Sequence, residues 1–85
     1  MTYGLILEHK AIDFLAGLEM SDRLRIAKKL NQVPDNPHHF FERLKESVLY
    51  RMRVGDYRLI AEISDETQAV KIILIGHRSN IYDRI

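Results

Sequence analysis

The segment Tyr50-Arg-Met-Arg-Val-Gly-Asp-Tyr-Arg-Leu-Ile60 carries three arginines at positions that a β-hairpin would bring together. Its middle dipeptide is Gly55-Asp56, and a two-residue loop that starts with glycine suits a type II′ hairpin turn. Side chains alternate along a strand, so this loop predicts Arg53 directly opposite Arg58, with Arg51 on the same face. Arginine forks bind phosphate oxygens through paired hydrogen bonds. The spacing therefore predicts a phosphate site on the hairpin.

The predicted arginine face has a shortage of acidic partners. Like charges directly opposite each other on two strands destabilise the pair by about 0.2–1 kcal/mol. Glu62 is the acid expected nearby, and Lys71, predicted to lie opposite it, competes for that carboxylate. Lys71 is also a candidate contact for a nucleic-acid backbone. The alternative interpretation is a solvated basic face that binds nothing.

The residues after the third predicted strand supply further candidates. In Gly76-His77-Arg78 the glycine permits a sharp turn beside the arginine face. His77 is a candidate for proton transfer near neutral pH, and Arg78 for a fourth phosphate contact. Tyr82 is a candidate for stacking on a base or donating its hydroxyl. Taken singly, His77 has a surface role and Tyr82 a packing role as alternatives.

Two helices are expected before the hairpin. A first strand from Thr2 to Leu7 precedes a helix over Glu8–Leu18, and a second helix starts at the N-cap Ser21 and ends at Pro34. Helical spacing predicts the buried stripes, which are Ala11, Ile12, Phe14, Leu15 and Leu18 in the first helix, and Leu24, Ala27, Leu30 and Val33 in the second. The basic residues of the second helix, Arg23, Arg25, Lys28 and Lys29, are expected mostly on its solvated outer side.

The second half of the chain is expected to be a meander of three strands. Phe40 to Leu44 has no clear period and is expected to be a short helical turn or a loop. Strands follow from Val48 to the Gly55-Asp56 loop, from that loop to Ser64, and from about Ala69 to Ile75 after a four-residue turn. This turn predicts pairs such as Glu62 with Lys71 and Leu59 with Leu74.

The order strand, helix, helix, strand, strand, strand predicts an α+β fold. The sheet is expected to be mainly antiparallel, with both helices packed on one face. The length of 85 residues predicts one domain, residues 1–85, with one core.

Composition excludes several classes of protein. The chain has 13 Lys and Arg against 12 Asp and Glu, so bulk charge does not identify a nucleic-acid binder. With no cysteine, no signal peptide and no apolar run near the ~20 residues of a membrane helix, we expect a cytoplasmic protein. Adjacent His38 and His39 point apart in an extended chain, and no nucleotide-binding glycine motif occurs. We therefore expect no metal and no cofactor.

The hairpin motif Tyr50–Ile60, followed by Ile75-Gly-His-Arg-Ser-Asn-Ile-Tyr82, resembles the RelE/ParE superfamily of toxins from toxin–antitoxin modules. RelE-type members are ribosome-dependent endoribonucleases that use a 2′-hydroxyl to attack the adjacent phosphate of mRNA, without a metal. The resemblance implies that Arg58 stabilises the phosphorane, that Arg78 assists the leaving group and that Tyr82 orients the substrate. It also implies a RelB-like antitoxin that covers the basic site in a hetero-oligomer.

One departure from the RelE pattern concerns the general base. Arg51 and Arg53 stand where the bacterial prototype has lysines, and arginine stays protonated, so both should act by charge stabilisation. Glu62 and His77 are the candidate bases, since some relatives use a Glu and a His. The alternative is that there is no strong base, and that the ribosome and substrate positioning do much of the work. Two alternatives remain open, namely a ParE-like toxin that binds DNA gyrase and has no nuclease activity, and a degenerate homologue that only binds RNA.

Overall fold

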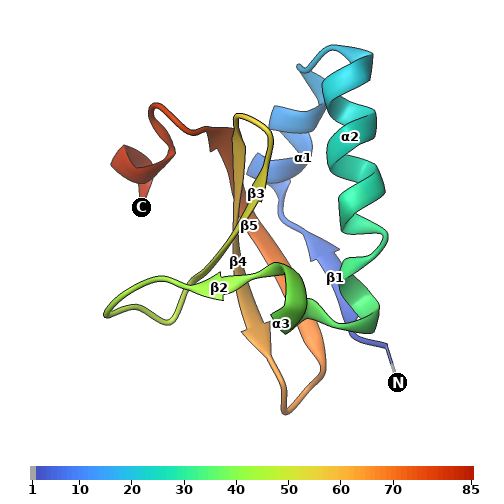
Figure 1. The fold of residues 1–85 in the computed structure, drawn as a ribbon, viewed down its shortest axis with the longest axis vertical. Coiled ribbons are helices and arrows are strands. Elements are labelled where there is room, and N and C mark those ends of the chain that lie inside the picture. Colours follow the sequence, from blue (N-terminus) through green and yellow to red (C-terminus); the bar gives the residue numbers. More distant parts are fainter. Residues whose placement is uncertain (1) are drawn as a thin grey trace.

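The computed structural model describes residues 2–85, which form a five-stranded sheet with the two longer helices against one of its faces (Figure 1). The elements in chain order are β1 (Gly4–Leu7), α1 (His9–Ala16), α2 (Met20–Leu30), η1 (Val33–Asp35), α3 (Pro37–Phe40), β2 (Glu42–Arg43), β3 (Tyr50–Val54), β4 (Tyr57–Ser64), β5 (Ala69–His77) and η2 (Ile81–Arg84). The strand order is β1-β5-β4-β3-β2, and only β1 and β5 run parallel. The predicted α+β class and mainly antiparallel sheet are confirmed.

The β3–β4 hairpin has the predicted register. Val54 pairs with Tyr57, and Arg53 lies opposite Arg58. Gly55 has a φ of 58°, the positive value that two-residue hairpin turns require. A Cβ at Gly55 would lie 2.7 Å from a guanidinium nitrogen of Arg25, so α2 packs directly over the turn.

The β4–β5 pairing follows the prediction for half of its length. The four-residue turn pairs Ser64 with Ala69, as expected. The register then shifts at a β-bulge, and Leu59 pairs with Ile75 instead of Leu74, so that prediction is wrong. Ile73 is the extra residue, and a bulge changes the side to which the following side chains point. The strand also continues to His77, two residues beyond the predicted end.

The sheet has apolar clusters on both faces. The larger cluster lies under α1 and α2 and includes Ile26, Leu59 and Ile72, each 0% exposed. The smaller cluster consists of Ile60, Leu74 and Ile81, with Leu44, Leu49 and Ile73 packed around it. It lies on the face away from α1 and α2, where the C-terminal segment with η2 lies beside the sheet (Figure 1). This second cluster was not predicted, because it depends on where the C-terminal segment docks.

The helices present partly different residues to the core from those predicted. Ile26 and Leu30 are buried, whereas Leu24 is 59% exposed and Ala27 is also exposed. Each residue advances about 100° around a helix, so Leu24 lies nearly opposite Ile26, and Leu30 lies only about 40° from it. The residues predicted to be buried in α2 were three apart in the sequence. Three residues turn through only about 300°, so each successive residue in such a series lies about 60° further around the helix. In α1 the prediction fails for Ile12, which is 51% exposed.

Several predicted boundaries also move. The N-cap of α2 is Glu19 rather than Ser21, and the helix ends at Leu30, before Pro34, which belongs to η1. The Phe40–Leu44 segment contains the end of α3 and the short strand β2, which adds to the sheet edge beside β3. None of the described helices is long and apolar enough to cross a membrane.

Ile26 and Leu24 provide a matched test of the observed orientation of α2. Ile26→Ala should lower the free energy of unfolding by about 2–5 kcal/mol, because it leaves a cavity in the core. Leu24→Ala should change it by less than about 0.5 kcal/mol, because the side chain is mostly in solvent. Urea unfolding followed by circular dichroism measures both, and equal losses would contradict this orientation.

Candidate functional site

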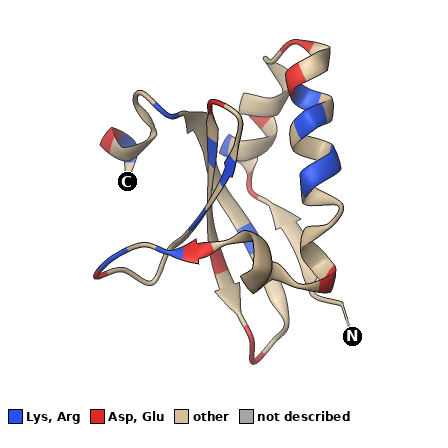
Figure 2. Ribbon diagram, viewed as in Figure 1, with Lys and Arg blue, Asp and Glu red and all other residues tan. Residues whose placement is uncertain are grey.

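The arginine face consists of Arg51, Arg53 and Arg58, which the β3–β4 register places on one side of the hairpin as predicted. Figure 2 shows the basic positions along the two hairpin strands. Arg58 folds back toward the turn, and one of its terminal nitrogens donates to the carbonyl oxygens of Gly55 and Tyr57, each at 2.9 Å. Among residues 2–85, neither Arg53 nor Arg58 forms an ion pair. Two opposed cations without a carboxylate between them favour binding of an anion.

The C-terminal segment crosses the same face. Ile81 is 0% exposed, and its side chain lies over Gly76, where a Cβ would meet it at 2.7 Å. This anchor places the Tyr82 hydroxyl 2.9 Å from a guanidinium nitrogen of Arg51, which donates to it. It also brings in Arg84, a residue that the sequence prediction missed, whose guanidinium lies 3.3 Å from the same Cβ position.

Arg78 lies at the turn end of the hairpin. Its backbone N–H donates to the Asp56 carbonyl at 2.8 Å, and its Nε lies 3.6 Å from the Asp56 carboxylate. Asp56 belongs to the two-residue turn, and Arg58 donates to the carbonyls on both sides of it. The structure therefore brings Arg78 to the hairpin end that also holds Arg58.

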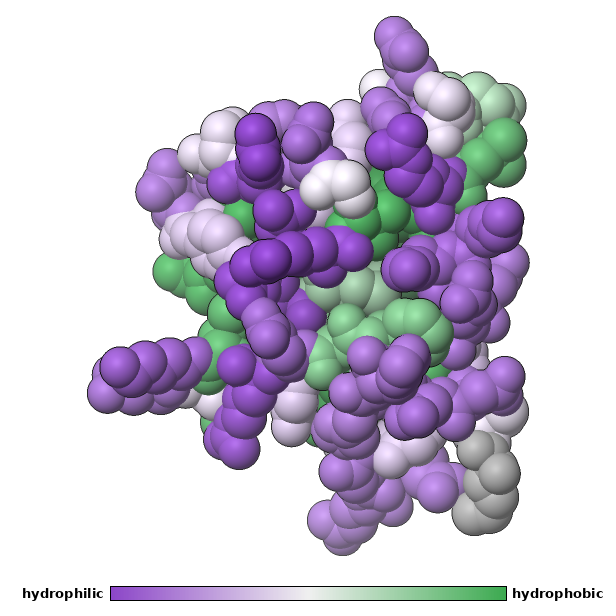
Figure 3. Space-filling model, in the orientation of Figure 1, coloured by the Kyte–Doolittle hydropathy of each residue, from purple (hydrophilic) through white to green (hydrophobic). Residues whose placement is uncertain are grey.

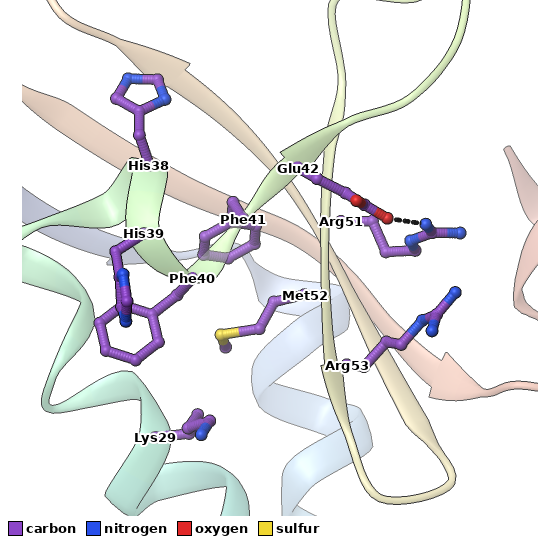
Figure 4. A pocket seen from close by; sticks show the side chains of 9 residues that line it. All are labelled: Lys29, His38, His39, Phe40, Phe41, Glu42, Arg51, Met52 and Arg53. Carbon is purple, nitrogen blue, oxygen red and sulfur yellow. Dashed lines mark hydrogen bonds and ion pairs between the residues drawn. The ribbon is translucent and has the colours of Figure 1, made fainter.

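Glu42 is the carboxylate at the other end of the arginine face, and the sequence prediction missed it. It lies on β2 opposite Arg51 and accepts a hydrogen bond from that guanidinium (Figure 4). This hydrogen bond and the charges of Arg51 and Arg53 hold the pKa of Glu42 below its ordinary value. The hydrogen bonds to Tyr82 and Glu42 in turn raise the pKa of Arg51. The position of Glu42 could not be predicted, because β2 is too short to show a recognisable strand pattern.

His77 does not lie where it was expected. The bulge in β5 places it opposite Tyr57, on the side of the sheet covered by the helices, and its ring lies 5.9 Å from the Tyr57 ring. Its Nδ1 accepts a hydrogen bond from the Ser79 backbone N–H at 3.2 Å. The expectation that His77 adjoins the arginine face is therefore wrong, because a one-residue shift in register moves a side chain to the other face.

Glu62 and Lys71 lie at the far end of the sheet from the hairpin turn. They face each other across β4 and β5, 4.0 Å apart, as the predicted register requires. Glu62 is four residues along β4 from Arg58, a separation of about 13 Å. The structure does not bring either side chain to Arg58 or Tyr82. Residues 2–85 contain no cluster of three or more His, Asp or Glu side chains that could hold a metal ion.

The geometry defines a cationic surface whose guanidinium donors are carried by the strands of one sheet. Arg53 and Arg58 offer fork-shaped donors from two strands of one sheet, and Arg51 is oriented by Tyr82 and Glu42. Rigid strands hold such donors more precisely than loops do. Fixed guanidinium groups can stabilise the charge that develops on a phosphoryl group during transfer.

The chain belongs to the family described as ParE toxin of type II toxin–antitoxin system, parDE, whose model matches residues 8–82. It is 26% identical over 88 residues to a RelE-like toxin protein of Escherichia coli, covering 98% of this chain and 93% of that protein. The resemblance inferred from the two motifs is confirmed.

Solved structures show the same fold. The RelE–RelB complex of Pyrococcus horikoshii is 25% identical with a TM-score of 0.80, covering 92% of this chain and 97% of that chain. The intact RelBE toxin–antitoxin complex of Escherichia coli is 25% identical with a TM-score of 0.75, covering 88% and 95%. These relatives and the family match identify the chain as a toxin of a RelBE-type toxin–antitoxin system.

The contact between Glu42 and Arg51 can be tested by titration. Because the guanidinium favours the ionised carboxylate, Glu42 should stay ionised to lower pH than an ordinary Glu, and the pairing should be lost as pH falls through that lowered pKa. In Arg51→Gln the pKa of Glu42 should rise. Carboxyl carbon NMR measures it, with Lys10→Gln on α1 as the control that leaves it unchanged. An identical titration in Arg51→Gln would show that the pair does not form in solution.

Proposed function

We propose that this toxin is an endoribonuclease that cleaves mRNA on the ribosome and so inhibits translation. The observation that supports the proposal most directly is the convergence of Arg51, Arg53 and Arg58 with Tyr82 from the C-terminal segment. Relatives described as RelE support the same assignment. The site of action is the cytoplasm, where mRNA is translated.

The proposed reaction is attack of a ribose 2′-oxygen on the adjacent phosphorus. The bond from the 2′-oxygen to phosphorus forms, the bond from phosphorus to the 5′-oxygen breaks, and the 2′-hydroxyl loses its proton to a base. Arg58 stabilises the charge on the phosphorane oxygens, together with Arg53 directly opposite it. Arg78 assists the departing 5′-oxygen, which takes its proton from water. Tyr82 orients the nucleotide.

Glu42 is our candidate for the base, in place of Glu62 and His77. It is a carboxylate on the arginine face that accepts from Arg51, which in turn donates to Tyr82, and like an ordinary Glu it is ionised at neutral pH. An ionised carboxylate accepts a proton, which arginine does not. A low pKa makes Glu42 a weak base, so positioning of the 2′-hydroxyl and charge stabilisation by the arginines supply the larger part of the rate.

The proposed partner is a RelB-like antitoxin. Structures of relatives are complexes of RelE with RelB, and we propose that this chain likewise forms a hetero-oligomer with a cognate antitoxin. An amphipathic antitoxin segment would cover the arginine face and compete with RNA for it.

A second candidate function is inhibition of DNA gyrase without nuclease activity. The family match to ParE toxins favours it. A supercoiling assay separates the two candidates, because a gyrase inhibitor reduces supercoiling and leaves mRNA on ribosomes intact.

Arg58→Ala tests the nuclease proposal. Loss of this charge-stabilising donor should lower mRNA cleavage on translating ribosomes by about 10²–10³-fold, and it should abolish growth arrest on expression. Primer extension maps and quantifies the cleavage. Lys10→Ala, which removes an exposed cation from α1, should cleave like the wild type. Intact mRNA with the wild-type protein would contradict the proposal.

Glu42→Gln tests the base. Cleavage should fall by roughly 10²–10⁴-fold, because the amide keeps the shape but cannot accept the proton. In the wild type the rate should decline as pH falls through the lowered pKa of Glu42, and the variant should lack this decline. Single-turnover cleavage across pH measures both. If Glu42 merely competes with phosphate for Arg51, the variant will instead bind RNA more tightly and cleave normally.

A further inference from the structure

Two pockets lie beside β3, whose edge is covered only in part by β2. Strand β2 pairs with Tyr50 and Arg51, and the rest of β3 has no strand neighbour on that side among residues 2–85. One pocket has a volume of about 510 Å³ and the other about 300 Å³, and both are lined by Lys29 and Arg53. Because they share these two residues, we treat them as one depression between α2 and the hairpin, and Glu42 and Arg51 of the arginine face line the larger pocket.

The walls of this depression are cationic. Arg25, Lys28 and Lys29 of α2 line it on one side and Arg53 lines it at the edge of β3, and we call the depression with these four cations the cationic trough. None of them forms an ion pair among residues 2–85. Of the described residues that line the two pockets, Glu42 is the one carboxylate, and it is paired with Arg51. The trough thus presents four cations without a matching acid.

The floor of the trough is apolar and partly aromatic. Phe41 is 4% and Met52 2% exposed at its base, and the Phe40 ring stands beside them (Figure 4). The Nζ of Lys29 lies 5.7 Å from the centre of the Phe40 ring. The centres of the His39 and Phe40 rings are 4.9 Å apart, and the two ring planes are at 90° to each other. Figure 3 shows apolar atoms at the centre of this face, between hydrophilic side chains over the hairpin and over α2.

We infer that the cationic trough binds the single-stranded RNA that continues from the arginine face, with phosphates on its four cations and a base against Phe40. Grooves for single-stranded nucleic acid combine a cationic track for the backbone with aromatic side chains on which bases stack. The trough has both parts, and it shares Arg53 with the arginine face. The inference rests on the proposed nuclease function and extends it, because it makes several nucleotides beside the cleaved bond part of the recognised substrate.

Other occupants fit the trough less well. A double-stranded RNA is recognised mainly by shape and backbone contacts and offers no free base for an aromatic floor. An acidic amphipathic peptide needs apolar anchors along its length, and the pocket beside the turn offers Val54 alone, among Arg25, Lys28 and Gln32. A single-stranded RNA fits both parts, because its flat bases can stack on the aromatic floor and its phosphates can pair with the cationic walls.

Binding of a non-cleavable RNA tests the trough without requiring catalysis. The probe is a fluorescein-labelled, fully 2′-O-methylated single strand of roughly eight nucleotides, and anisotropy gives its affinity over a range of salt. Arg25→Gln and Lys28→Gln should each weaken binding and reduce the slope of log affinity against log salt by about 0.7. Lys10→Gln, an exposed cation on α1 outside the trough, should leave the slope unchanged.

Phe40→Leu separates stacking from charge. It should weaken binding by roughly 5- to 100-fold through loss of stacking, without changing the salt slope. A thermal melt checks that each variant is folded. If Phe40→Leu is unfolded, Lys29→Gln provides a second probe of the same pocket. Trough variants that bind the RNA as Lys10→Gln does would overturn the inference. So would variants that lose antitoxin affinity and keep RNA affinity. Both results leave the proposed function standing if the wild type still cleaves mRNA on ribosomes.

Discussion

The pairing of β3 with β4 decides which side chains share a face, and the rest of the site depends on it. The turn at Gly55 sets the register, and Arg25 of α2 packs against that turn. A slip of one residue would carry Met52 to solvent and the arginines into the core, so burial under the helices holds the register in place. The same constraint keeps Arg53 opposite Arg58 despite their repulsion. The face retains an electrostatic preference for an anion because folding forces these cations together.

A second constraint acts through apolar contacts on the arginine side of the sheet. Ile60 and Leu74 are covered there by Ile81 from the C-terminal segment. This apolar packing of Ile81 fixes the C-terminal segment against the sheet, and it thereby fixes the position of the neighbouring polar residues. Tyr82 thereby reaches Arg51, and the arginine face becomes the rim of a small apolar cluster.

Prediction from sequence succeeded where structure is local. The two-residue and four-residue turns follow from turn chemistry and alternation, and the registers next to them were correct. It failed where the outcome depends on contacts distant in sequence. The bulge lets both Ile73 and Leu74 pack in the smaller apolar cluster, and no local sequence pattern predicts it. That bulge removed His77 from the arginine face. The short strand β2 was equally hidden, and with it Glu42.

The amino-acid sequence by itself determined the order of the two longer helices and the main strands, and the grouping of three arginines on one hairpin. These follow from residue types, from period-two alternation and from a glycine turn, all of which act within a few residues. Its two motifs also carry the resemblance to the family. Only the tertiary structure decided which acid meets those arginines, which side His77 faces and where Tyr82 lies. It also aligned α2 with the open edge of β3 to form the cationic trough. Each of these depends on how segments far apart in the chain pack their apolar surfaces, which no local pattern specifies.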